Sequence, residues 1–135
     1  EMYTKKIQIE ARVLGDLALN HIIPVATRYQ STLLDNMVKL KELFGERAIE
    51  MAKCDMESIE KISSHMSIIK TKVTDMVEAR KKANAIESER EKAIAYHDTV
   101  VPAMEEIRYH IDKLELMVDN EIWPLPKYRE LLFIR

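Results

Sequence analysis

The middle third of the chain carries an apolar seam with heptad spacing. Its members follow one another at intervals of three and four residues: Ile59, Ile62, Met66, Ile69, Val73 and Met76. This is the period of a helix, not the alternation of a strand. Such a seam packs its side chains as knobs into the holes of a facing helix. We therefore expect a long helix that belongs to a helical bundle.

Glycine and proline are scarce, which limits the number of turns. The chain has two glycines and four prolines in 135 residues, well below the roughly 12% of an average chain. Gly45 suits the position after a helix that ends at Phe44. Asn84 can take a left-handed cap, and Ser88 with Glu91 forms a capping box that starts a helix. These signals predict three long helices, at about 2–44, 46–84 and 88–120.

The two outer helices carry apolar stripes of helical period as well. The stripe of the first contains Ile7, Ala11, Leu14, Ala18, Ile22, Ala26, Tyr29, Leu33, Met37, Leu40 and Phe44. The stripe of the third contains Ala93, His97, Val100, Met104, Ile107, Ile111, Leu114 and Val118. Short connections make neighbouring helices antiparallel. The predicted fold is all-α, an elongated antiparallel bundle formed by residues 1–122.

Two prolines lie inside the predicted helices. Pro24 and Pro102 each lack a donor and clash with the carbonyl four residues back, so each should kink or break its helix. Counting from the two turns places both opposite residues 66–71 of the middle helix. A break at Pro24 would give four helices instead of three, which is the main structural alternative.

The C-terminal end has a different character. Residues 123–126 read Trp-Pro-Leu-Pro, which cannot continue a helix. We expect an extended tail over 123–135, whose large apolar side chains would promote aggregation unless they dock on a surface. The predicted docking residues are Trp123, Leu125, Tyr128, Leu131, Leu132 and Phe133.

No residue pattern indicates a catalytic, cofactor or metal site. Bundle di-metal enzymes use Glu-x-x-His pairs, and the sequence has none. His97 falls on a seam and His21 beside one, whereas His65 and His110 fall on flanks, so all four are interpreted as structural residues. Cys54 has no partner for a disulfide and is typical of a reducing compartment. The two glycines form no phosphate-binding loop.

Charge and hydropathy exclude two classes of partner. The net charge of −2 gives no bulk attraction to nucleic acid. The longest run without a charged residue, 17–27, is about half of the ~20 residues that a membrane span requires. We expect neither a nucleic acid nor a membrane as partner.

Four segments resemble a known family. They are ARVLGDLALNHIIP at 11–24, EARKKAN at 78–84, RYHIDKLEL at 108–116 and WPLPKYRELLF at 123–133. The chain resembles, over essentially its full length, the C-terminal region of type III glutamine synthetases. The resemblance implies a parent enzyme, a glutamate–ammonia ligase, that makes glutamine, ADP and phosphate from glutamate, ammonia and ATP. It also implies a divalent metal, Mg²⁺ or Mn²⁺, a cytoplasmic location and an assembly of identical subunits.

The family's catalytic and cofactor residues lie upstream, and none can be carried onto this sequence. The resemblance therefore implies a non-catalytic structural or assembly domain that docks on the catalytic domain of its own or a neighbouring subunit. The tail would dock on the bundle or on that catalytic domain. A free-standing coiled-coil interaction module explains the heptads equally well, but it leaves the tail unexplained.

Overall fold

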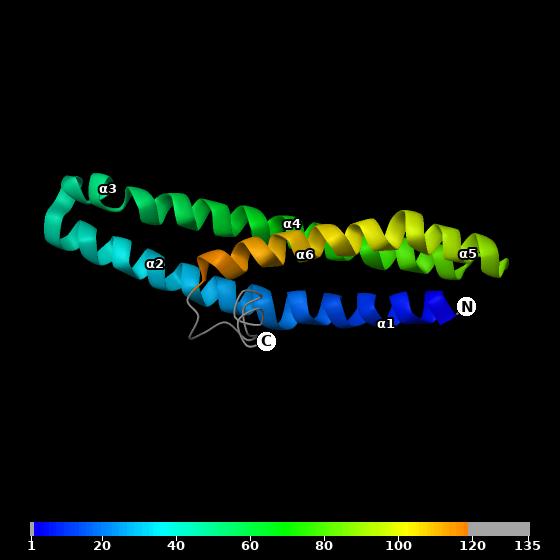
Figure 1. Ribbon diagram of the computed structural model, residues 1–135. Coiled ribbons are helices and arrows are strands. Elements are labelled where there is room, and N and C mark those ends of the chain that lie inside the picture. The colour runs from blue at the N-terminus through cyan, green and yellow to red at the C-terminus, as the bar shows by residue number, and fades with distance from the viewer. Residues whose placement is uncertain (1, 119–135) are drawn as a thin grey trace, which may run out of the picture.

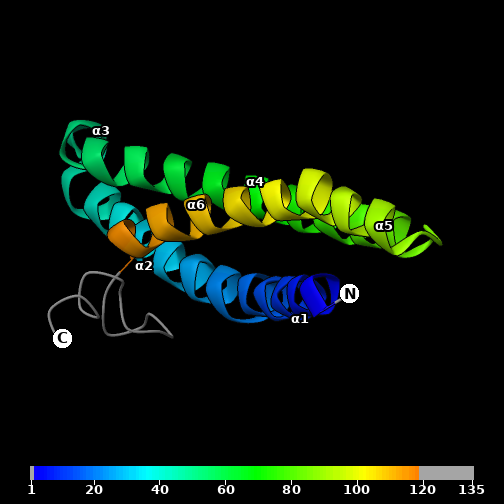
Figure 2. The same ribbon diagram turned by 45° about the vertical axis from the view of Figure 1, so that its right-hand side comes forward.

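The computed structural model describes residues 2–118, and every regular element in that range is helical. The helical elements follow one another in three rods, each an end-to-end run of helices, and the rods lie along one long axis (Figure 1). The second rod returns antiparallel to the first, and the third returns antiparallel to the second; the turned view of Figure 2 shows the same order. The predicted all-α bundle is confirmed. The predicted tail 123–135, like residue 1 and the end of the third predicted helix, lies outside the described residues.

The first rod consists of α1 (Met2–Leu17), one π-helical turn (Ala18–Ile22) and α2 (Ile23–Phe44). Pro24 lies in the first turn of α2, where its missing N–H costs least. In the turn before it, the N–H of Ile23 donates to the carbonyl of Ala18, which is a π-helical spacing. The rod changes direction there without ending (Figure 1). The four-helix alternative is therefore not what the structure shows.

The second rod begins after a tight turn at Gly45. This glycine has a φ of 62°, a backbone conformation that residues with a Cβ rarely adopt. A 3₁₀ turn (Gly45–Arg47), α3 (Ala48–Met51) and α4 (Lys53–Asn84) follow. At the far end, the Ser88 side chain accepts a hydrogen bond from the N–H of Glu91 at 3.4 Å, as the capping box predicts. Asn84 takes no left-handed cap; its side-chain oxygen instead accepts a hydrogen bond from the hydroxyl of Tyr96.

The third rod consists of α5 (Glu89–Ala95), a second π-helical turn (Tyr96–Val100) and α6 (Val101–Met117). Here the N–H of Val101 donates to the carbonyl of Tyr96, directly ahead of Pro102. The wider turn shifts the register by one residue. Tyr96 is completely buried, whereas the side chain of His97 is 74% exposed. The prediction that His97 lies on the seam is wrong because it assumed α-helical spacing through this turn.

The core runs along α4, which packs against α6 on one side and the first rod on the other. Its largest fully buried side chains are Tyr96, Ile22, Ile62, Ile69, Met76, Met104, Ile107, Leu114 and Val100. Gly15 faces α4, and a Cβ there would lie in van der Waals contact with it, 3.4 Å from the Cε of Met76. Hydrogen bonds from Gln30 to the Ile59 carbonyl (2.9 Å) and the Ser63 hydroxyl (2.6 Å) join α2 to α4.

The two prolines do not share one level of the bundle. Thr27, close to Pro24, contacts the sulfur of Met66 at 3.5 Å, so Pro24 lies near its predicted level. Pro102 lies instead beside Asp75 and Ala79. The prediction of a common level is wrong because it assumed that the third rod starts level with the end of α4. Tyr96, the residue after α5, contacts Asn84, the last residue of α4.

Candidate interaction site

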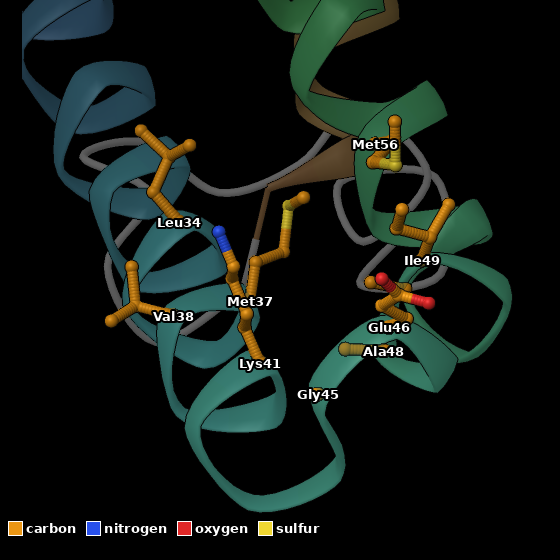
Figure 3. A pocket seen from close by; sticks show the side chains of 10 residues that line it. Leu34, Met37, Val38, Lys41, Gly45, Glu46, Ala48, Ile49 and Met56 are labelled. Atoms are coloured by element: carbon orange, nitrogen blue, oxygen red, sulfur yellow. The ribbon is translucent and has the colours of Figure 1, made fainter.

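An apolar groove lies where the first rod turns into the second. It has a volume of about 680 Å³ and opens between α2 on one side and the 3₁₀ turn, α3 and the start of α4 on the other (Figure 3). Its apolar walls include Leu34, Met37, Val38, Ile49, Ala52 and Met56. Lys41 and Glu46 stand on opposite sides of it. The groove is therefore suited to an apolar ligand surface with polar edges.

The groove exists because the third rod is shorter than the other two. The last residue of α6, Met117, lies beside Cys54 and Ser58 of α4, and α6 reaches only part of the way along α2 (Figure 1). Within residues 2–118, the two arms of the hairpin pack only on each other beyond that level. Val38 is 58% exposed and Ile49 is 67% exposed as a result. Clustered large apolar side chains on a surface mark an interaction site.

Small residues set the floor of the groove. Ala48 and Ala52 are buried, and the N–H of Ala52 donates to the carbonyl of Ala48 at 2.8 Å. The amide of Asn36 donates to the carboxylate of Asp55 at 2.9 Å and joins the two arms. Gly45 makes the tight turn between them. The separation of the two arms is thus set by a tight turn and a polar contact.

A pair of histidines lies between α4 and α6. The Nδ1 atoms of His65 and His110 are 2.9 Å apart, and the ring centroids are 5.1 Å apart. One ring donates and the other accepts, which requires both to be neutral or only one to be charged. Burial lowers the pKa of His65, and the positive charges of His110, Lys113 and Lys61 lower it further. The pair therefore loses its hydrogen bond when both rings are protonated.

The four histidines do not come together as one site. His21 lies 3.7 Å from Asp16 and His97 lies 3.1 Å from Asp98, both at the surface. Within residues 2–118, no group of three or more His, Cys, Asp and Glu side chains is placed to hold a metal ion.

Sequence reasoning missed the His65–His110 contact. His65 lies three residues after the buried Ile62, and His110 lies three residues after the buried Ile107. This spacing places both histidines next to the packed faces of their helices, and it was the signal in the sequence that could have predicted the contact.

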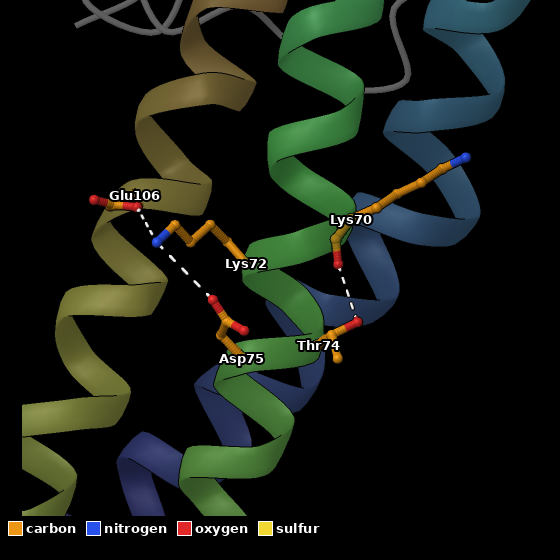
Figure 4. Close-up of polar contacts among 5 residues, drawn as sticks. All are labelled: Lys70, Lys72, Thr74, Asp75 and Glu106. Carbon is orange, nitrogen blue, oxygen red and sulfur yellow. Dashed lines mark hydrogen bonds and ion pairs between the residues drawn. The ribbon is translucent and has the colours of Figure 1, made fainter.

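An ion pair also joins α4 to α6. The Nζ of Lys72 lies 2.9 Å from a carboxylate oxygen of Glu106 and 3.9 Å from one of Asp75 (Figure 4). The hydrogen bond and charge of Glu106 raise the pKa of Lys72. In the same turn of α4 the hydroxyl of Thr74 donates to the carbonyl of Lys70 at 3.2 Å. These groups are exposed, so they contribute little to stability and are interpreted as surface contacts.

Comparison with known proteins relates the chain to one family. A family profile described as the glutamine synthetase C-terminal domain matches residues 1–41. A glutamine synthetase of Bacteroides fragilis is 57% identical over the whole chain, which covers 19% of that protein. A type-3 glutamine synthetase of Dictyostelium discoideum is 30% identical, again over the whole chain and 18% of the relative. The chain belongs to the glutamine synthetase family.

The chain spans less than a fifth of the length of these curated glutamine synthetases and aligns with their C-terminal part. The predicted resemblance to a type III C-terminal region is thereby confirmed. The family profile covers α1 and nearly all of α2. Within residues 2–118, no helix is both long enough and apolar enough to span a membrane. The predicted docking residues between Trp123 and Phe133 lie outside the described residues.

Proposed function

We propose that this C-terminal segment is a structural and assembly domain of a glutamine synthetase and carries no part of its active site. The observation that supports this is the match of the whole chain to the C-terminal part of glutamine synthetases. The complete enzyme condenses glutamate with ammonia and converts ATP to ADP and phosphate. It binds ATP and Mg²⁺ or Mn²⁺ upstream of this domain, and it works in the cytoplasm.

The bundle and the tail have separate roles in this proposal. The bundle role belongs to residues 1–122, whose described part shares one apolar core along α4. Residues 123–135 form the docking segment, with Trp123, Leu125, Tyr128, Leu131, Leu132 and Phe133 as its contact residues. The partners are the catalytic domain of the same or a neighbouring subunit in a homo-oligomer. A free-standing coiled-coil module is disfavoured by the match to much longer glutamine synthetases.

A stripe on α1 supports contact with the catalytic part. Met2, Ile9 and Val13 are all more than 60% exposed and lie on one helical face, at spacings of seven and four residues. In a longer polypeptide, the preceding residues join the bundle at this end of α1. The upstream catalytic part is therefore the nearest surface that can cover the stripe.

The test replaces the stripe in the full-length enzyme. Ile9→Asp with Val13→Asp should dissociate the assembly or displace the domain, because two buried carboxylates in an apolar contact are strongly unfavourable. Light scattering gives the mass of the assembly, and glutamine formation gives its activity. Leu43→Asp, at an exposed apolar position that is not on the stripe, is the control. Unchanged mass and activity in the double variant would contradict the proposal.

A further inference from the structure

We propose that the apolar groove at the hairpin end receives the chain's own C-terminal tail, with Trp123 seated between α2 and α3. This rests on the docking role proposed above for residues 123–135 and names the surface that they use. Three observations support it: where α6 ends, how far the following residues reach, and what the groove is made of.

The described chain ends next to the groove. Val118, the residue after α6, is buried and extended, with its N–H bonded to the carbonyl of Leu114 at 2.9 Å. Met117 lies beside Cys54 and Ser58, so α6 ends level with Met56 in the groove wall, although Cys54 and Met56 lie on different faces of α4. In Figure 3 the end of α6 lies behind the groove, between the two arms. The last described residues therefore lie at the level of the groove wall.

The reach of the tail matches the length of the groove. From Met56 to Ala48 the second arm extends about 12 Å at the helical rise of 1.5 Å per residue. The five residues from Val118 to Trp123 can span up to about 17 Å when extended. Pro124 and Pro126 favour extended backbone at the residues directly before them, Trp123 and Leu125. This reach exceeds the length of the groove wall, so an extended tail is long enough to place Trp123 along the groove.

The chemistry of the two surfaces also matches. The groove walls are aliphatic side chains and two methionines, Met37 and Met56, which adapt their shape and contact aromatic rings favourably through sulfur. The tail supplies aromatic and aliphatic side chains, among them Trp123 and Tyr128. The groove continues the hairpin beyond the point where α6 stops covering it. A segment that follows α6 directly is therefore its natural occupant.

The chain has one tryptophan and one cysteine, which allows a direct contact test. In a Cys54→Ser background, Ile49→Cys is labelled with bimane, a fluorophore that tryptophan quenches on contact. Ile94→Cys, at the opposite end of the bundle, is the matched control; both isoleucines are at least half exposed. Each labelled chain is compared with and without Trp123→Phe.

We expect bimane at position 49 to brighten several-fold when Trp123 is replaced, and bimane at position 94 to be unaffected. Equal emission with and without Trp123 at position 49 would overturn the proposal. Quenching that disappears on dilution would also overturn it, since the tail would then occupy the groove of a second copy. The measurement uses the 135-residue chain alone. Its failure is therefore distinct from failure of the assembly role, which is measured on the full-length enzyme.

Discussion

Replacement of Tyr96 by alanine tests the register that the second π-helical turn imposes. The Tyr96 ring is completely buried, and its hydroxyl donates to the side chain of Asn84. Truncation of a buried aromatic residue costs about 3–5 kcal/mol. Of this, the hydrogen bond accounts for about 0.5–1.5 kcal/mol, because Asn84 is exposed and water can replace the lost donor. Tyr96→Phe should therefore cost only that smaller amount.

His97 provides the matched control for this series. In an uninterrupted α-helix His97 would occupy the seam and Tyr96 would not, whereas the π-helical turn exposes His97. His97→Ala should change the free energy of unfolding by less than about 0.5 kcal/mol. Urea unfolding followed by circular dichroism gives the three values on one scale. If His97→Ala costs more than Tyr96→Ala, the π-helical register is wrong.

Three further predictions concern the same bundle. Gly15→Ala should stabilise the chain by about 0.5–1 kcal/mol, because the added methyl meets the flexible end of Met76 at an ordinary contact distance and glycine is a poor helix residue; a lower thermal midpoint would contradict this. Since the pKa of His65 is lowered on folding, the unfolded chain binds more protons below about pH 6.5, and stability should fall as the pH drops through that value. His65→Asn should weaken the pH dependence of the free energy of unfolding, measured by urea unfolding at a series of pH values. An unchanged pH dependence in this variant would show that it arises from other groups. Calorimetry of the isolated chain with millimolar ATP and magnesium should show no saturable binding, and a micromolar affinity would place a nucleotide site in this domain.

The fold could be predicted where local signals agree with the bundle. The heptad seam of α4 locates the buried residues Ile62, Ile69 and Val73, and the Gly45 turn follows from the scarcity of glycine. The register of the third rod could not be predicted in the same way. Pro102 signals a disturbance, but the sequence offers no way to distinguish a kink from a π-helical turn that inserts one residue and exchanges His97 for Tyr96.

The groove was only partly visible in the sequence. Leu34 and Val38 belong to α2, and their exposure follows from the length of the third rod, which ends at Met117 while the hairpin continues. No such uncovered end was predicted from the sequence. Which side chains line it depends on the rotation of each arm, and that is set by the packing of Ala48 and Ala52. The His65–His110 contact depends on the same relative rotation of α4 and α6.

Removal of the C-terminal segment that corresponds to residues 1–135 of this chain from the full-length enzyme tests the central claim most directly. The measurement is the mass of the assembly in solution, taken together with nucleotide binding by the remaining protein. We predict that the truncated enzyme still binds ATP with magnesium but no longer forms the native assembly. A truncated enzyme that assembles fully and makes glutamine at the normal rate would contradict the assembly role. A truncated enzyme that assembles but cannot bind ATP would contradict the claim that the domain carries no part of the active site.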